Sequence, residues 1–206
     1  MVFLLVPQLP LLDLAGPAQV FSTAADMGCE YTLGYVAERE EVPTAQGVPV
    51  RARAVWPEVG PEDLVVIPGW RSPVLGGNGQ LDPSSLRRLS DYHRAGGTVA
   101  SVCSGTFALG RAGLLDGRRC TTHHDLQDEL ARRYPKATVV RDVLYVTDGR
   151  VITSAGIASG IDLALHLVAV RHGAGAPRAS PARWWSTPAA MATNGRPARC
   201  CATDRT

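Results

Sequence analysis

The segment TVASVCSGTFALGRAGLLDGRRCTTHH (98–124) decides the fold of this chain. Its apolar run 98–102 ends at a single thiol, Cys103, and a Ser-Gly pair follows directly. A continuous apolar run of this length predicts a strand that is buried on both faces. The small residues Ser104 and Gly105 permit a sharp turn into a helix. The pattern therefore predicts a strand that carries a cysteine into a nucleophile elbow.

Short apolar strands alternate with helical patterns along the rest of the chain. We predict strands at 2–6, 31–37, 64–69 and 98–102, two or three more within 138–156, and helices at 17–28, 81–97, 105–112, 124–134 and 160–173. Apolar strands separated by helices are typical of a mainly parallel sheet covered on both faces. We therefore predict an α/β three-layer sandwich over 1–173. An irregular tail, rich in Ala, Pro and Arg, is expected over 174–206.

Composition and charge argue against several classes of function. The chain has 206 residues and 45% hydrophobic content, which is enough for one sizeable core. Its net charge is only +2 and its basic residues are scattered, so no nucleic-acid face is predicted. No apolar stretch approaches the roughly 20 residues that cross a bilayer, and we expect a cytoplasmic protein without membrane contact. The five cysteines lack CxxC or Cys/His spacing, so we expect no disulfide framework, no metal and no cofactor.

Cys103 is the leading candidate for a catalytic group. A cysteine taken alone is more often a buried apolar residue, but the elbow pattern favours a functional site. The N–H groups at a helix start point at the thiol and are expected to favour thiolate, the form that acts as nucleophile. The backbone N–H of Ser104 is a candidate to stabilise a developing oxyanion.

Two further segments are expected at the same edge of the sheet. In LLDLAGPAQVF (11–21), Asp13 follows a strand, and Pro17 suits the first turn of a helix. Asp13 either caps that helix or places its carboxylate over Cys103, where each group would change the pKa of the other. Gly69 follows another strand, and its N–H is a candidate for the second half of an oxyanion hole; a plain loop glycine is the alternative.

Three segments resemble the PfpI/ThiJ superfamily of class I glutamine-amidotransferase-like domains. They are DLAGPAQVFSTA (13–24), VCSGTFALGRAGLLDGRRCTTHH (102–124) and VLYVTDGRVITSAGIASGIDLALHLV (143–168). The resemblance is strongest to the branch that forms the N-terminal domain of AraC-type transcriptional regulators. It implies a flavodoxin-like sandwich, a homodimer and an elbow at Cys103.

The resemblance also bears on individual positions. His123 stands where the regulator branch carries a histidine near its pocket, whereas His124 stands where the branch more often has Trp. Asp162 matches an aspartate that recurs in the family. It can equally be an acidic residue in the first turn of a helix, so we assign it no catalytic role. True amidotransferases use a downstream His-x-Glu with the cysteine, and no such pair is found here. Glutaminase activity is therefore not expected.

Two functions remain open. The first is a small-molecule-sensing domain of an AraC-type regulator that lacks its DNA-binding region, so no specific DNA binding by this chain is expected. In its tail, WWSTP (184–188) replaces the family's VV-x-P, and we interpret residues from about Arg178 as out of frame. The alternative resembles isocyanide hydratases, in which Cys103 would attack the isocyanide carbon and Asp13 would move the proton. Those enzymes usually have Thr after the cysteine, and Ser104 keeps that hydroxyl.

Overall fold

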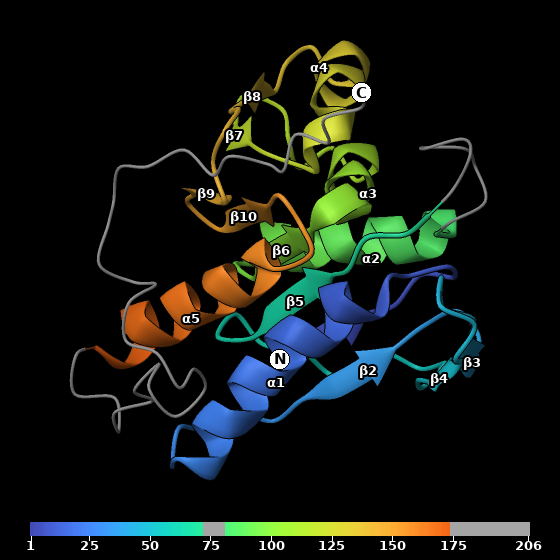
Figure 1. Ribbon diagram of the computed structural model, residues 1–206, viewed down its shortest axis with the longest axis vertical. Coiled ribbons are helices and arrows are strands. Elements are labelled where there is room, and N and C mark those ends of the chain that lie inside the picture. The colour runs from blue at the N-terminus through green and yellow to red at the C-terminus, as the bar shows by residue number, and fades with distance from the viewer. Residues whose placement is uncertain (72–80, 174–206) are drawn as a thin grey trace, which may run out of the picture.

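The strand that ends at Cys103 lies inside a six-stranded sheet (Figure 1). The computed structural model describes residues 1–71 and 81–173, so the tail expected over 174–206 lies outside the described residues. The sheet order is β2 (Gly34–Val36), β1 (Val2–Leu4), β5 (Leu64–Ile67), β6 (Thr98–Val102), β10 (Val151–Ser154) and β9 (Tyr145–Asp148). All neighbouring pairs are parallel except β9 with β10. The predicted mainly parallel α/β sandwich is confirmed.

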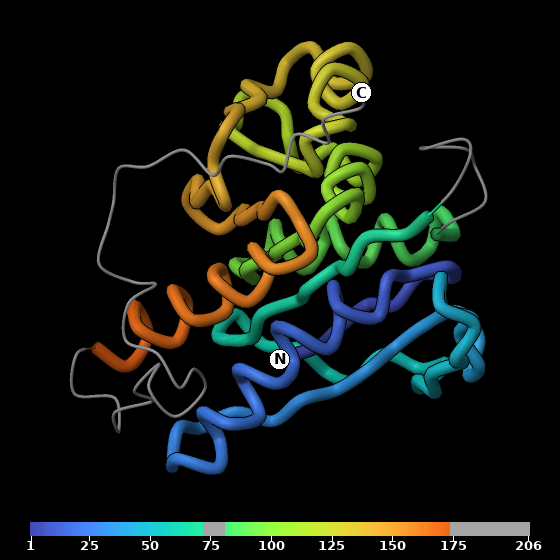
Figure 2. Tube along the Cα trace, viewed as in Figure 1, coloured from blue at the N-terminus to red at the C-terminus, as the bar shows by residue number. Residues whose placement is uncertain are grey.

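Helices cover both faces of this sheet. One face carries α1 (Leu11–Asp26) and α5 (Ser159–His172), which lie side by side although they stand near opposite ends of the described chain (Figures 1 and 2). The other side carries α2 (Pro83–Arg94), α3 (Thr106–Arg111) and α4 (Gln127–Arg133). Within β6, Val99 packs in one core and Val102 in the other. Burial on both faces explains why the strand reads as a continuous apolar run.

Short elements complete the fold. They are the pair β3 (Glu41–Val42) and β4 (Val50–Arg51), the pair β7 (Arg119–Cys120) and β8 (Thr138–Val139), and two 3₁₀ turns at Cys103–Gly105 and His124–Leu126. The two-residue strands β3, β4 and β7 were not predicted, because they are too short to show an apolar period. The Asp148-Gly149 pair, a typical hairpin turn, joins β9 to β10. No helix among the residues placed by the structure is long and apolar enough to cross a membrane.

The prediction for the start of α1 was wrong. The helix begins at Leu11, and Pro17 lies inside it rather than in its first turn. Leu14, Ala18 and Phe21 are buried at helical spacing in one core, and this apolar stripe extends the helix towards the N-terminus. Proline has no N–H, so it leaves the carbonyl of Asp13 without its usual bond within the helix. Asp13 consequently sits in the first helical turn and not on a strand-end loop.

The elbow itself is present. Cys103 has φ 56°, a left-handed conformation that is rare for a residue with a side chain. A 3₁₀ turn over Cys103–Gly105 precedes α3, so the helix starts at Thr106, close to the predicted position. At Gly105, a Cβ atom would collide with the carbonyl oxygen of Ile67 at the end of β5. Glycine is therefore required for the close approach of the two strand ends.

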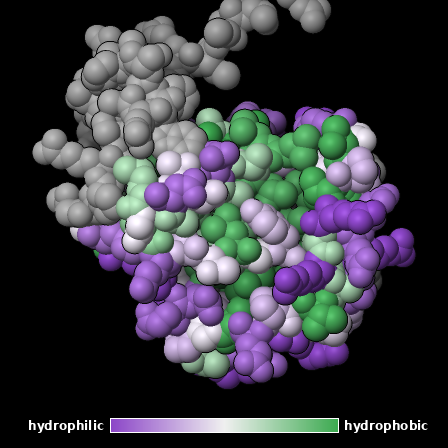
Figure 3. Space-filling model, turned by 90° about the horizontal axis from the view of Figure 1, so that it is seen from below, coloured by the Kyte–Doolittle hydropathy of each residue, from purple (hydrophilic) through white to green (hydrophobic). Residues whose placement is uncertain are grey.

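Figure 3 shows the molecule from below, and apolar side chains gather near the centre of this face among charged ones. The expected homodimer would need such a surface, since subunit interfaces have apolar centres and polar rims. Light scattering with mass determination in solution tests that expectation, which stays a prediction.

Candidate active site

Hydrogen bonds from two threonines hold the strained backbone of Cys103. Its carbonyl oxygen accepts from Oγ1 of Thr122 at 2.8 Å and from Oγ1 of Thr106 at 3.3 Å. Both threonines are buried, and the single hydroxyl proton of Thr106 is shared between the carbonyls of Cys103 and Thr121, the latter at 2.9 Å. The surrounding structure thus over-determines a conformation that is unfavourable by itself. The Cys103 side chain stays partly exposed, while its neighbours in the turn are buried.

The carboxyl group of Asp13 is completely buried against this elbow. Its Oδ1 accepts from the N–H of Ile157 at 2.8 Å, and its Oδ2 has no partner of hydrogen-bonding geometry in the described parts of the chain. Gly69 packs between the two side chains: a Cβ atom there would lie 2.7 Å from Oδ2 of Asp13 and 2.9 Å from Cβ of Cys103. The structure therefore brings Asp13, Gly69 and Cys103 together, although Asp13 comes from the first turn of α1 and not from a loop after a strand.

Gly156 is a second glycine at the thiol, and sequence reasoning missed it. It has φ +97°, and a Cβ atom there would lie 2.9 Å from Sγ of Cys103. The next residue, Ile157, supplies the N–H that holds Asp13. The available signal was a glycine two residues after the end of strand β10, at the sheet edge that carries the other site residues.

The electrostatics of Cys103 differ from the expectation. Burial raises the pKa of its thiol to about 12, and the charge of Asp13 adds to this rise. The N–H and hydroxyl of Ser104 oppose the shift without overcoming it. The prediction that the helix start favours thiolate was therefore wrong, because desolvation and a nearby negative charge outweigh the N–H groups of a short turn.

Asp13 is also shifted towards its protonated form. Burial raises its pKa, although the N–H of Ile157 and the Cys103 side chain favour the carboxylate. Since both groups resist ionisation, loss of both protons from the pair is disfavoured. Asp13 and Cys103 therefore titrate as one coupled unit.

Ser104 fixes the loop that follows β5. Its Oγ accepts from the N–H of Trp70 at 2.7 Å and donates to the carbonyl of Trp70 at 2.9 Å. The hydroxyl is thus fully engaged and buried, which leaves the backbone N–H, directed towards the thiol, as the group available for an anion. Trp70 and its loop are positioned by this double contact.

A cleft of about 750 Å³ opens in front of the thiol. A cleft of this size is in the range of small-molecule sites. It combines a guanidinium, an imidazole and a carboxylate with apolar walls. Its lining residues are Gln8, Pro10, Trp70, Arg71, Cys103, Ser104, His123, Asp125, Leu126 and Ile157. Sequence reasoning did not single out Arg71, because nothing in its local pattern separates it from other surface arginines.

His123 lies at the start of a 3₁₀ turn and also lines the cleft. Its Nδ1 accepts from the N–H of Asp125 at 3.4 Å, as a residue at a helix start does. Its ring also lines the cleft beside Cys103. Asp162, by contrast, lies in the first turn of α5 and is not among the cleft residues; burial raises the pKa of its carboxyl group.

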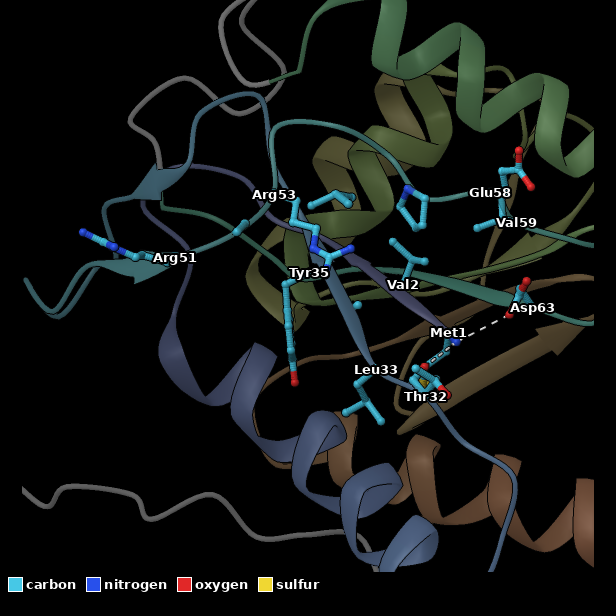
Figure 4. A pocket seen from close by; sticks show the side chains of 14 residues that line it. Met1, Val2, Thr32, Leu33, Tyr35, Arg51, Arg53, Glu58, Val59 and Asp63 are labelled. Carbon is cyan, nitrogen blue, oxygen red and sulfur yellow. Dashed lines mark hydrogen bonds and ion pairs between the residues drawn. The ribbon is translucent and has the colours of Figure 1, made fainter.

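A second cavity of about 610 Å³ lies at the opposite end of the parallel strands (Figure 4). Tyr35, Arg53 and Val59 line it, and beside them the amino group of Met1 bonds to Thr32. Its lining contains neither a thiol nor an imidazole. The nucleophile and the titratable pair belong to the Cys103 cleft, which we take as the candidate active site.

Known proteins share this arrangement of elements. A protein in the cpoL 5′ region of Streptomyces lividans is 40% identical over 142 residues, covering 65% of this chain and 94% of its own. The isonitrile hydratase of Pseudomonas putida is 34% identical over 172 residues, covering 80% of this chain and 68% of the enzyme.

The HTH-type transcriptional regulator CdhR of Pseudomonas aeruginosa is 40% identical over 93 residues; the match covers 45% of this chain but only 27% of the regulator. Among solved structures, a ThiJ/PfpI family protein from Pseudomonas syringae superposes with TM-score 0.70 at 27% identity, covering 82% of this chain and 67% of that one. The sequence family DJ-1/PfpI matches residues 1–170. The chain therefore belongs to the DJ-1/PfpI family.

Proposed function

We propose that the chain is a small-molecule-sensing domain of the kind found in AraC-type regulators, with the Cys103 cleft as its ligand site. The observation that carries this proposal is the cleft of about 750 Å³ in front of Cys103, in which Arg71 and His123 stand beside apolar walls. A thiol whose pKa is raised to about 12 is a weak nucleophile at neutral pH, which suits binding without turnover. The similarity to CdhR supports the same role. Gly69, Ser104 and His123 would contribute to binding, together with Arg71.

A thermal-shift screen of small organic compounds tests the proposal. A ligand present at about 100 times its Kd should stabilise the domain by about 2.7 kcal/mol. Arg71→Ala should abolish that stabilisation. Arg53→Ala is the matched control, because it removes a guanidinium from the second cavity. Stabilisation that is lost in Arg53→Ala and kept in Arg71→Ala would contradict a ligand site at Cys103.

The proposed sensor is not expected to select DNA sequences. The described elements form an α/β sandwich, and the basic residues of the chain are scattered. A gel shift with duplex DNA at physiological salt is therefore expected to show no nanomolar, sequence-selective complex. Such a complex would contradict this part of the proposal.

Hydration of isocyanides is the second candidate, and the buried contact between Asp13 and Cys103 favours it. The 34% identity to isonitrile hydratase supports the same chemistry. In this reaction, the sulfur would bond to the terminal isocyanide carbon while the thiol proton passes through Asp13 to that carbon, giving a thioimidate. Asp13 would then take a proton from a water that attacks the same carbon and give it to the nitrogen. Cleavage of the C–S bond, with the proton of the new hydroxyl returning to sulfur through Asp13, would release an N-formamide and restore the thiol.

Loss of the isocyanide stretch in the infrared, matched by formation of formamide, measures this activity. If the chain is a hydratase, Cys103→Ala and Asp13→Asn should both abolish turnover. Asp162→Asn should keep it, since that carboxyl group lies outside the cleft. A wild-type protein that binds a ligand but turns over no isocyanide is a sensor and not this enzyme.

A further inference from the structure

Three consecutive residues at the rim of the cleft bring metal-binding atoms together. His123, His124 and Asp125 each offer one ligand atom, and these atoms lie within 4.8 Å of one another. Nε2 of His124 lies 3.1 Å from Oδ1 of Asp125, and Nδ1 of His123 lies 3.6 Å from Oδ2 of Asp125. Because Nδ1 of His123 also accepts from the N–H of Asp125 at 3.4 Å, a metal ion on this atom would replace that long hydrogen bond. The two imidazole rings also face each other, with centroids 4.3 Å apart.

These separations suit a metal ion. Zinc binds histidine nitrogen and carboxylate oxygen at about 2.0–2.2 Å. In a tetrahedral zinc site, two ligand atoms therefore lie about 3.4 Å from each other. The separations of 3.1 and 3.6 Å fall on either side of that value. The side chains of His124 and Asp125 are 76% and 71% exposed, so they are free to rotate around an ion.

We propose that His123, His124 and Asp125 bind one divalent transition-metal ion of the zinc type. A set of two imidazoles and one carboxylate binds such ions in preference to Mg²⁺ or Ca²⁺, which favour all-oxygen ligands. Nε2 of His124 and Oδ1 of Asp125, 3.1 Å apart, are close enough for one ion to contact both atoms. This inference goes beyond the proposed sensing function and does not rest on it.

The position of the ion gives it a role at the cleft. His123 and Asp125 line the same cleft as Cys103. Three protein ligands leave at least one coordination position open, as in catalytic zinc sites. That open position would accept a carboxylate or another electron-pair donor of a small molecule in the cleft. The proposed metal site therefore lies at the Cys103 cleft itself and not at a remote part of the surface.

Titration with Co²⁺ tests the proposal by its visible spectrum. The protein used is the full chain with Cys200→Ser and Cys201→Ser, which removes an adjacent pair of thiols from the sequence. We expect one equivalent of Co²⁺ to give ligand-field bands without a sulfur-to-cobalt charge-transfer band, and Zn²⁺ to displace it. Absence of saturable binding overturns the proposal, and so does a charge-transfer band, which would place a thiolate on the metal.

Single substitutions then locate the ligands. His124→Asn and Asp125→Asn should each weaken Co²⁺ binding by at least about tenfold, since even the loss of a ligand's supporting partner costs that much. His166→Asn and Asp128→Asn are the matched controls; His166 stacks on Tyr145, and Asp128 pairs with Arg141. Circular dichroism verifies that each variant is folded. Affinities that are equal in test and control variants overturn the proposal.

Discussion

The N–H of Ile157 donates to Oδ1 of Asp13 at 2.8 Å and joins the loop after β10 to the first turn of α1. This bond fixes a completely buried carboxyl group against the side chain of Cys103. The thiol is itself held at the end of β6 by a strained elbow. Three segments from distant parts of the sequence therefore define the protonation state of one sulfur atom.

Replacing Asp13 by Asn should make Cys103 more reactive. The charge of Asp13 contributes to the raised pKa of the thiol, so its removal should lower the pH midpoint of Cys103 alkylation by about one unit or more. Iodoacetamide labelling across a pH series, read by mass spectrometry, measures the midpoint. Asp162→Asn, a half-buried carboxyl group outside the cleft, should leave it unchanged. An unchanged midpoint in Asp13→Asn would show that the two groups are not coupled.

The same substitution should stabilise the fold at neutral pH. The folded-state pKa of Asp13 is raised by burial, so the native state holds a proton that the unfolded chain has lost. The free energy of unfolding of the wild type should therefore fall as pH rises from the unfolded pKa, near 3.8, through the folded pKa.

Asn keeps an acceptor for Ile157 and carries no charge. We expect Asp13→Asn to be more stable than wild type by an amount on the order of 1 kcal/mol at pH 8, and by less at pH 4. Urea unfolding at the two pH values measures the difference. If the stability difference between Asp13→Asn and wild type were smaller at pH 8 than at pH 4, ionisation of Asp13 would not destabilise the fold.

Cys103 in the wild type should react slowly at neutral pH. With a pKa of about 12, its alkylation rate should rise about tenfold per pH unit between pH 7 and 10, because only thiolate reacts. Cys120 should react more slowly at pH 7 despite its lower pKa of about 11, because its side chain is completely buried. A rate for Cys103 that levels off near pH 8 would indicate a thiolate that burial does not suppress.

Gly156→Ala should lower the free energy of unfolding by more than the cost of its backbone conformation, because the new methyl group also contacts Cys103. Its φ of +97° costs a residue with a Cβ roughly 1–2 kcal/mol. The new methyl group would also overlap Cys103, adding about 1–3 kcal/mol. Gly113→Ala is the matched control, with φ +73° and open space around it. Denaturant unfolding should separate the variants by that added amount; equal losses would show that the Cys103 contact is not tight.

Ser104→Ala should loosen the loop at Trp70. It leaves the N–H and carbonyl of Trp70 without their buried partner, which costs about 1–3 kcal/mol for an unsatisfied group. Ser84→Ala, at an exposed position of α2, should change the free energy of unfolding by less than about 0.5 kcal/mol. Equal effects of the two substitutions would mean that Ser104 does not hold the loop.

Local pattern determined the elements that surround the site. The apolar run before Cys103 could only be a buried strand, and the small residues after it allowed the elbow. Because parallel strands end at one edge of a sheet, Asp13 and Gly69 were candidates for positions near Cys103, with a helix cap and a plain loop glycine as the alternatives. The strand and the elbow depend only on short-range pattern, so the sequence alone could predict them.

Packing decided what local pattern could not. The helix start at Leu11 depends on an apolar stripe that overrides the preference of Pro17 for a first turn. The ionisation of Cys103 depends on how deeply the sheet edge buries it and on the charge of Asp13, and burial is a property of the assembled fold. The sequence by itself thus determined the strand and the elbow that carry Cys103. Only the tertiary structure decided that Asp13, Gly69 and Gly156 contact the thiol and which group holds the proton, because contacts between distant segments, and the desolvation they cause, are set by every element that packs around the site.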